Sequence, residues 1–163
     1  LQEAGVRVKL DDADRSPGWK FSDQEMRGIP VRLELGPKDI EQGQCVIVRR
    51  DTREKIIAPL EKIGETLGKV LETMQEDMYN KAKEHLDRNT HIAHDWDEFN
   101  DLLEKKQGFI RAMWCGCREC EEKIKEETKA TIRCIPFDAP EEEGKCIYTG
   151  KPSKCRVIFA RNY

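Results

Sequence analysis

The sequence predicts an α/β protein of two units, the first over residues 1–88 and the second over residues 89–163. Short segments with apolar residues at every second position, or in continuous runs, alternate with segments in which apolar residues recur every three or four positions. One long segment of the second kind separates the two halves. Strands that alternate with helices are typical of α/β sheets.

The first unit is expected to begin with a strand over residues 6–10, where apolar and charged residues alternate. Ser22, followed three residues later by Glu25, is a capping-box pattern and predicts the start of a short helix. Gly28 and Pro30 are expected to end this helix and to start an extended segment.

The extended segment, residues 29–35, is expected to be a strand with one apolar and one charged face. Apolar residues occupy its alternate positions, and Arg32 and Glu34 lie between them. Residues 36–39 are expected to close the strand with a turn. If Arg32 and Glu34 point the same way beside Glu25, they form a small surface with both hydrogen-bond donors and acceptors.

Three further segments complete the first unit. Residues 45–48 form a continuous apolar run of the kind found in buried parallel strands, and the charged residues 49–52 predict a turn. Residues 55–58 predict another strand. Over residues 60–86, apolar residues recur at spacings of three and four, which predicts one long helix. Its polar face mixes acids with bases, which favours water over a membrane surface.

The second unit is expected to be a small α/β sandwich, because strands and helices alternate again. Gly108 is expected to stop the first helix. The predicted elements are a helix at 97–106, a strand at 109–114, a helix at 119–129, a strand at 130–137, an acidic loop at 138–145 and a strand at 155–160.

Composition excludes several classes of protein. The chain has 163 residues, of which 37% are charged, and a formal net charge of -3, so any contact with RNA must be local. No apolar run approaches the length of a membrane span or a signal peptide. Seven unevenly spaced cysteines favour reduced thiols or a metal site over a disulfide framework, which suits a cytoplasmic protein. Two of them lie in apolar strand patterns and are expected in the core: Cys45 and Cys134.

Several pieces of sequence, in a fixed order, point to one family. They are GWKF at 18–21, E-x-x-G-I-P-V-R-L-E-L-G-P-x-D at 25–39, VRRDTREK at 48–55, MWCG at 113–116, ECEEKIKEETKATIRCIPF at 119–137 and RVIFARNY at 156–163. Together they resemble the C-terminal part of the archaeal/eukaryotic-type prolyl-tRNA synthetases. The resemblance covers nearly the whole chain apart from its helical middle.

The resemblance implies a mixed-sheet anticodon-binding domain of the class II synthetase type, truncated at its N-terminus, followed by a small α/β zinc-type domain. It implies that a catalytic domain using ATP and Mg²⁺ precedes Leu1, and that this chain alone does not activate proline. The expected partners are the anticodon loop of tRNA(Pro), the catalytic domain of the same protein, and a second copy bound through the missing part.

The resemblance assigns anticodon contacts to Glu25, Arg32 and Lys55. Proline anticodons end in two guanines, whose N7 and O6 acceptors suit Arg and Lys and whose N1 and N2 donors suit a carboxylate. The alternatives are that Glu25 only caps its helix, that Arg32 pairs with Glu34 or Glu54, and that Lys55 is an ordinary surface lysine. The arginines of the following turn are expected to hold phosphates or to stay solvated: Arg49, Arg50 and Arg53.

The cysteines of the second unit give a metal prediction. In the resembled family a zinc site uses C-x4-C followed by C-x2-C, and here Thr149 stands at the fourth position. A structural zinc site has four closed ligands, and a threonine hydroxyl replaces a thiolate poorly. Either Cys117 or Cys155 completes the set, or the site is vestigial and packing alone holds the fold. The first three positions are occupied by Cys115, Cys120 and Cys146.

The chain ends on an aromatic residue, Tyr163. Frayed ends usually carry small polar residues and tolerate loss, so this terminus is expected to dock. In the resembled synthetases the terminal tyrosine reaches toward the catalytic domain, with its carboxylate near the active site. The alternative is that Tyr163 packs on its own domain.

Two functions of other classes stay open. One is a free-standing RNA-binding module. The other is a metal- or redox-sensing domain built on the cysteine cluster.

Overall fold

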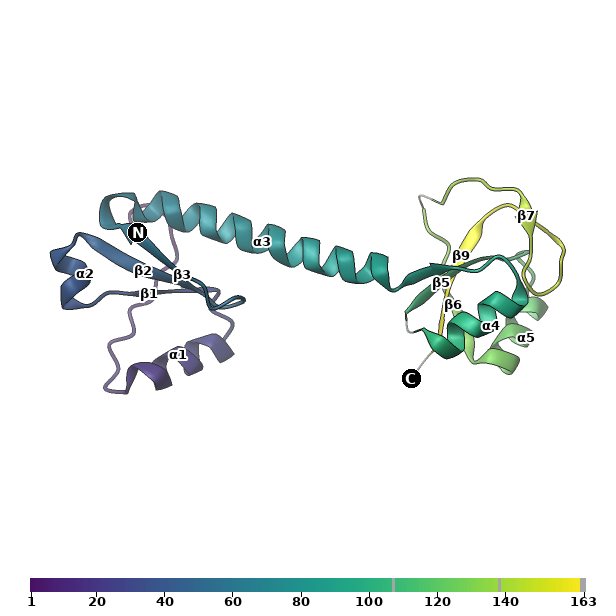
Figure 1. Cartoon of the computed structure of the whole chain (residues 1–163), viewed down its shortest axis with the longest axis horizontal. Coiled ribbons are helices and arrows are strands. Elements are labelled where there is room, and N and C mark those ends of the chain that lie inside the picture. The colour runs from purple at the N-terminus through teal and green to yellow at the C-terminus, as the bar shows by residue number, and fades with distance from the viewer. Residues whose placement is uncertain (107, 138, 162–163) are drawn as a thin grey trace. The chain divides into compact units, whose positions relative to one another are not determined.

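The computed structural model describes residues 1–106, 108–137 and 139–161, and its helices and strands confirm the α/β class (Figure 1). Tyr163 lies outside the described residues. The chain divides into two compact units, Leu1–Asn80 and Lys81–Tyr163. The elements are α1 (Pro17–Met26), β1 (Val31–Glu34), α2 (Pro37–Glu41), β2 (Gln44–Arg49), β3 (Lys55–Pro59), a 3-10 turn (Leu60–Lys62), α3 (Ile63–Arg88), β4 (Thr90–Ile92), α4 (Trp96–Lys105), β5 (Phe109–Met113), α5 (Arg118–Thr128), β6 (Ala130–Cys134), β7 (Gly144–Lys145), β8 (Pro152–Ser153) and β9 (Arg156–Arg161).

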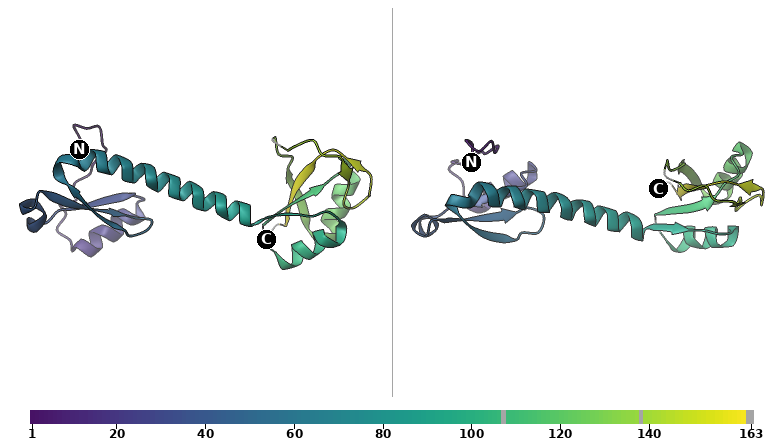
Figure 2. Two further views of the ribbon diagram at one scale, coloured as in Figure 1. Left: turned by 45° about the horizontal axis from the view of Figure 1, so that its top comes forward. Right: turned by 90° about the horizontal axis from the view of Figure 1, so that it is seen from above.

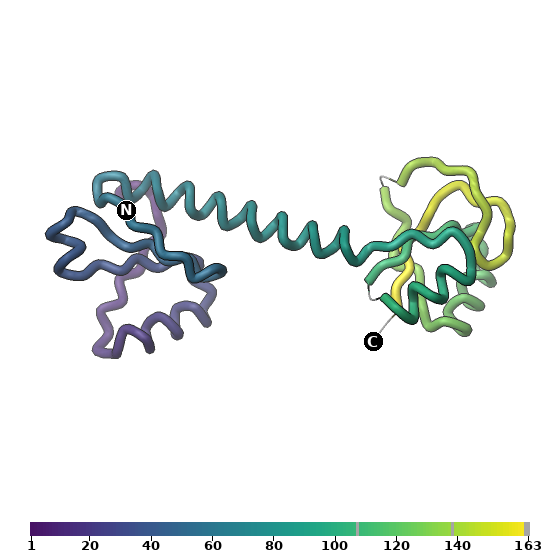
Figure 3. Tube along the Cα trace, in the orientation of Figure 1, coloured from purple at the N-terminus to yellow at the C-terminus, as the bar shows by residue number. Residues whose placement is uncertain are grey.

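The first unit is built on an antiparallel sheet in the order β1–β2–β3, and Figure 3 traces the chain through it. Directly paired residues share a face, so Arg32 and Val48 lie on one face and Leu33 and Ile47 on the other. The start of α3 covers the Ile47 face, and α1 lies on the Arg32 side (Figures 1 and 2). The buried core under α3 consists of Cys45, Ile47, Ala58, Val70 and Met74.

Two strand predictions for the first unit are wrong. The run at 45–48 belongs to an antiparallel strand, because β2 is the central strand and its residues are covered on both faces, which gives the same continuous apolar pattern. Residues 6–10 form no strand, although they alternate in polarity. Leu10 is 81% exposed, so this alternation marks no buried face.

The helix boundaries also differ from the prediction. The first helix starts at Pro17, after Ser16, and Ser22 lies inside it. Proline is favoured in the first turn because its fixed φ suits a helix and its missing N–H would have no partner there. Residues 36–39, expected to be a turn, begin the short helix α2, whose entry is held by a 2.9 Å hydrogen bond from the Gly36 amide to Asp39.

The second unit contains a four-stranded mixed sheet in the order β4–β5–β9–β6, where β4 and β5 are parallel and β9 is antiparallel to both its neighbours. Helices α4 and α5 contribute Phe99 and Ile124 to one core with Val157 and Phe159 of β9. The predicted strand at 130–137 ends earlier, at Cys134. This cysteine is exposed, because the pairing of β6 with β9 becomes irregular between Ile132 and Cys134.

Gly108 stands between α4 and β5, as predicted, and the structure shows why a glycine is needed. Its φ is 121°, and a Cβ atom at this position would lie 2.0 Å from the carbonyl oxygen of Asn89. Within the described part of the chain, no helix combines the length and the apolar character that crossing a membrane requires.

Candidate functional site

The three residues predicted to contact an anticodon gather on one side of the first sheet. Arg32 of β1 pairs in register with Val48 of β2, which pairs with Lys55 of β3, so Arg32 and Lys55 lie on the same face. Glu25 lies in the last turn of α1, and its carboxylate accepts a hydrogen bond from Arg32 on that face. The antiparallel hairpins and the short α1–β1 connection therefore bring together residues separated by thirty positions of sequence or fewer.

These side chains form a row of alternating charges. Arg32 donates from Nη1 to Glu25 Oε1 and from Nε to Glu34 Oε1, each at 2.7 Å. The Nζ of Lys55 lies 3.8 Å from Glu34 Oε2. The guanidinium carbon of Arg32 lies 4.1 Å from the centre of the Phe21 ring, a cation–π distance. Two carboxylates and one ring thus fix the orientation of Arg32.

The structure shows which local contacts Glu25 and Arg32 make in the free protein. Glu25 is not a helix cap, since it lies in the last turn of α1 and its carboxylate accepts from arginines. Arg32 does pair with Glu34, as the alternative supposed, and it pairs with Glu25 at the same time. The side chains of Glu25 and Arg32 are 18% and 22% exposed, so both remain reachable from water.

The Glu25 carboxylate is held in its charged form. Its pKa is lowered chiefly by a hydrogen bond from Arg53, and the charge and hydrogen bond of Arg32 add to this, while partial burial opposes it. Arg53 was expected only to hold phosphates or to stay solvated. The sequence gives no signal for its contact with Glu25, which depends on the shape of the turn between β2 and β3.

Arg49 does not fit the prediction of a phosphate-binding or solvated arginine. It is buried, and its Nη2 lies 2.7 Å from both Asp51 and Asp77. The hydrogen bonds that Arg49 donates to Asp51, and then to Asp77, raise its pKa well above the usual value. Since Asp77 belongs to α3, Arg49 joins the β2 end of the sheet to that helix and has a structural role.

The other two arginines of this turn remain at the surface of the site. Arg50 Nη1 lies 3.4 Å from the carbonyl oxygen of Glu25, and Arg53 bonds the carboxylate of the same residue. Together they border an open hollow of about 430 Å³ between the end of α1 and the turn. Ser22 and Met26 complete its lining. A larger hollow beside α5 has mixed charges, and its Arg161 is occupied in bonds to the carbonyls of Thr128 and Leu103.

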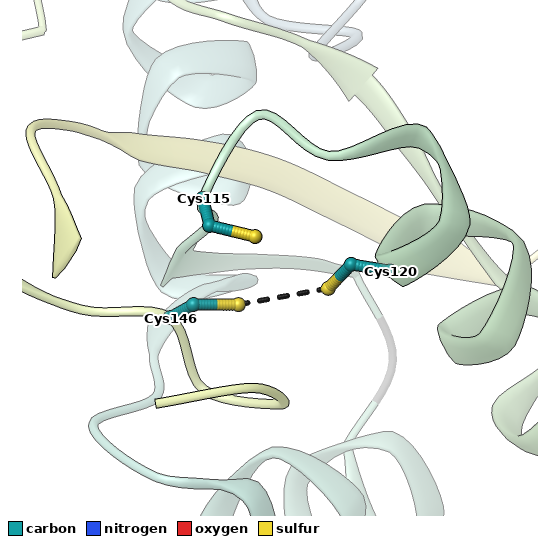
Figure 4. Close-up of side chains that lie close together, drawn as sticks. All are labelled: Cys115, Cys120 and Cys146. Atoms are coloured by element: carbon teal, nitrogen blue, oxygen red, sulfur yellow. Dashed lines mark hydrogen bonds between the residues drawn. The ribbon is translucent and has the colours of Figure 1, made fainter. Parts of the chain in front are cut away.

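The second unit brings three cysteines together (Figure 4). Cys115 follows β5, Cys120 lies in the first turn of α5, and Cys146 follows β7. Their sulfur atoms all lie within 4.8 Å of one another, and those of Cys120 and Cys146 are 3.6 Å apart. In a tetrahedral site with Zn–S bonds of about 2.3 Å, sulfurs are about 3.8 Å apart. The three thiols therefore fit three corners of a zinc site.

Thr149, which stands at the fourth position of the resembled motif, lies beside this cluster. Its hydroxyl oxygen lies 3.6 Å from the sulfur of Cys115. Among the described residues, neither Cys117 nor Cys155 joins the cluster of Cys115, Cys120 and Cys146. The chain as folded therefore offers three thiols and one hydroxyl. This donor set fits zinc at three positions and lacks the fourth thiolate of a closed site.

The thiols differ in how readily they lose a proton. Burial raises the pKa of Cys146, but hydrogen bonds from the side chain and backbone of Thr149 outweigh it and lower the pKa to about 7. Burial is the main reason why the pKa of Cys120 is raised, and its hydrogen bond with Cys146 adds to the effect. Of these two thiols, Cys146 is therefore the one that more readily binds a cation as a thiolate.

The loops that carry these cysteines are held by backbone hydrogen bonds. The amide of Cys146 donates to the carbonyl oxygen of Lys151 at 2.8 Å, and the amide of Gly150 donates to the carbonyl oxygen of Cys146 at 2.9 Å. Ser153 donates from its hydroxyl to the carbonyl of Trp114 at 2.6 Å. The cluster thus lies in a pair of loops that are also joined by these hydrogen bonds.

Comparison with known proteins agrees with this geometry. Residues 1–70 match the family described as anticodon binding domain, and residues 96–163 match the family described as prolyl-tRNA synthetase, C-terminal. The proline–tRNA ligase of Lachnospira eligens is 51% identical over 163 residues, which are 100% of this chain and 34% of that protein. That of Lachnoclostridium phytofermentans is 52% identical over 157 residues, 96% of this chain and 33% of that protein. That of Agathobacter rectalis is 54% identical over 158 residues, 96% of this chain and 33% of that protein.

The fold of the first unit, its row of Glu25, Arg32 and Lys55, and the match over residues 1–70 define the class of protein: the chain contains an anticodon-binding domain of the aminoacyl-tRNA synthetase type. It spans about a third of the length of the curated relatives it matches. The chain belongs to the proline–tRNA ligase family, as the resemblance predicted, and represents the anticodon-binding and C-terminal domains of that family.

Proposed function

We propose that this chain is the tRNA-recognition part of a proline–tRNA ligase, which attaches proline to tRNA(Pro) with the use of ATP. The observation that carries the proposal is the row of alternating charges on the first sheet, from Glu25 through Arg32 and Glu34 to Lys55. Such a row offers both donors and acceptors, which a guanine base requires. The family matches support this function over a free-standing RNA-binding module and over a cysteine-based sensor.

Each residue of the row has a role that follows from its chemistry. Arg32 and Lys55 donate to the O6 and N7 acceptors of the two guanines at the end of a proline anticodon. Glu25 accepts from N1–H and N2–H of one of them. Because Phe21 and two carboxylates already orient Arg32, little side-chain freedom is lost on binding, and this favours affinity.

The second unit has a structural part in the proposal. A zinc ion held by Cys115, Cys120 and Cys146, with Thr149 at the fourth corner, would tie together three loops of this unit. The partners we propose are the anticodon loop of tRNA(Pro), a catalytic domain that holds ATP and Mg²⁺, and a second copy of the enzyme. Tyr163 is proposed to dock toward that catalytic domain, and the proposed location is the cytoplasm.

The test is the effect of Arg32→Ala on the choice of RNA. The full-length natural protein and its variant are titrated with a proline anticodon stem-loop and with a loop that carries adenine at both guanine positions. Loss of a bidentate base contact should weaken binding of the guanine loop and reduce the preference by ~1–3 kcal/mol.

The matched control is Arg27→Ala, which removes an arginine of the same helix end whose partner is Asp23, outside the row. This variant should lose some affinity for both RNAs equally and keep the preference. If Arg32→Ala leaves the preference unchanged, or if Arg27→Ala reduces it as much, the assignment of Arg32 to a base is wrong.

A further inference from the structure

Arg53 binds the carboxylate that is proposed to read guanine. Its Nη1 hydrogen-bonds Glu25 Oε1, and the same oxygen accepts from Arg32 Nη1 at 2.7 Å. The two arginines differ in how firmly they are held. Arg32 also has Glu34 and the Phe21 ring as partners, whereas the side chain of Arg53 is 63% exposed. Arg53 is therefore the partner of Glu25 that can leave.

The backbone places Arg53 in this position at a cost. Its φ is 64°, in the left-handed region that residues other than glycine rarely adopt. The turn around it is fixed by hydrogen bonds, from the Arg53 amide to the Arg49 carbonyl and from the Arg49 amide to the Glu54 carbonyl, both at 3.1 Å. A strained conformation that the surrounding structure maintains is a reason to look for a function at that residue.

The guanidinium of Arg53 offers the same chemistry as one edge of guanine. Both present neighbouring N–H donors in one plane, and both suit a carboxylate acceptor. In the free protein, Arg53 thus occupies the Glu25 oxygen that the N1–H and N2–H groups of a base would need. Glu25 Oε1 already accepts from Arg32 and Arg53. If Arg32 keeps its hydrogen bond to this oxygen, a base that binds there must replace Arg53.

We propose that Arg53 is an exchangeable counter-ion of Glu25 that makes this site selective for a base with N–H donors. In the free protein it neutralises the carboxylate. When guanine binds, its N–H donors replace Arg53 on Glu25, and Arg53 turns to a phosphate of the RNA beside Arg50, at the open hollow that both residues line. Only hydrogen bonds and ion pairs are exchanged. The inference rests on the proposed function and adds a specificity-determining residue to it.

The exchange has a consequence that a simple phosphate contact lacks. Removing Arg53 frees a hydrogen-bonding position on Glu25 for guanine and leaves the carboxylate with Arg32 as its remaining cationic partner, so a base without N–H donors there faces a less neutralised carboxylate. The preference for guanine over adenine should therefore increase when Arg53 is lost, by roughly two- to fivefold, the value of an exposed ion pair. Affinity for both RNAs should fall at low salt, and the salt dependence should decrease by about one phosphate contact.

The experiment compares the full-length natural protein with Arg53→Ala and with the control Arg27→Ala, on the two stem-loops, at several salt concentrations. The expected result is a larger guanine preference and a shallower salt dependence for Arg53→Ala alone. In Arg53→Ala/Glu25→Gln, the increase in preference should disappear, because the carboxylate charge that Arg53 neutralised is gone.

The other outcomes separate the inference from the function it rests on. If the unmodified protein prefers guanine but Arg53→Ala lowers that preference, Arg53 holds Glu25 in place during binding and the exchange is wrong. If Arg53→Ala changes only the salt dependence and leaves the preference unaltered, Arg53 is a phosphate contact alone. If the unmodified protein shows no preference, the proposed function fails, and the exchange fails with it.

Discussion

Replacing Thr149 by cysteine should convert the three-thiol cluster into a four-thiolate zinc site. The hydroxyl oxygen of Thr149 already lies 3.6 Å from the sulfur of Cys115, close to the spacing of about 3.8 Å expected between two thiolates on one zinc ion. The substitution therefore puts a fourth thiol beside Cys115, at the position where a hydroxyl stands now. Structural zinc sites with four ligands bind with about 10–16 kcal/mol, or roughly 2.5–4 kcal/mol per ligand. We expect Thr149→Cys to bind zinc about a hundred to a thousand times more tightly.

The assay is competition for zinc with a chromophoric chelator of known affinity at pH 7. Thr149→Ser, which keeps a hydroxyl, should bind zinc as the natural sequence does, and Cys117→Ser should change nothing, because Cys117 is not part of the cluster. The melting temperature of the second unit should rise with zinc concentration more steeply in Thr149→Cys, since a ligand stabilises only the state that binds it. Equal zinc affinity for Thr149→Cys and Thr149→Ser would refute the claim that position 149 is the fourth corner.

Two further predictions concern stability. Arg49→Leu should lower the urea midpoint of the first unit at pH 7, because it leaves Asp51 without its partner. Unfolding is followed by the fluorescence of Trp19. The control Arg118→Leu, which removes an exposed ion pair with Glu122, should have little effect on the midpoint. Arg49 lowers the pKa of Asp51 in the folded state, so its stabilisation is present above the usual Asp value of 3.8 and is lost as the pH falls through the lowered value. The difference from the natural sequence should thus narrow at pH 3, and a constant difference would contradict this cause. Gly108→Ala should destabilise the second unit by more than about 1 kcal/mol in urea unfolding, because its Cβ would meet the Asn89 carbonyl, whereas Gly150→Ala, with φ of 68° but open space, should cost less. Equal costs for the two glycines would show that the close contact does not matter.

The long helix shows both the strength and the limit of pattern analysis. Apolar residues at spacings of three and four predicted a helix over 60–86, and α3 spans Ile63–Arg88. The pattern did not show where the apolar face is covered. Leu67, Val70 and Met74 are buried, whereas Met78 and Leu86 are about half exposed. Periodicity reports local structure, and coverage depends on elements far away in the sequence.

Strand pairing was the least predictable part of the fold. The apolar run at 45–48 is compatible with any strand covered on both faces, so it could not distinguish a parallel strand from the central strand of an antiparallel sheet. Residues 6–10 alternate in polarity but pair with no strand in the described part of the chain, so the alternation alone wrongly predicted a strand there. The start of α1 was available in the sequence, as Ser16 before Pro17, but the capping-box pattern at Ser22 competed with it.

The candidate site was predicted residue by residue only with the help of family resemblance. Physical reasoning from the strand pattern put Arg32 and Glu34 on one face and brought Glu25 near, which the hydrogen bonds of the structure confirm. The contact of Arg53 with Glu25 could not be predicted, because it depends on a positive φ in the turn between two strands. The place of Thr149 beside Cys115 was implied by spacing within the resembled motif.

The most direct test of the central claim is equilibrium binding of the unmodified full-length protein to two RNAs at one fixed salt concentration. One is a proline anticodon stem-loop, and the other carries adenine at the two guanine positions. If Arg32, Lys55 and Glu25 read guanine edges, the first RNA should bind more tightly by at least ~1–3 kcal/mol, the value of one good bidentate contact. Equal affinities would contradict the account, because an interaction limited to phosphates does not distinguish the two loops.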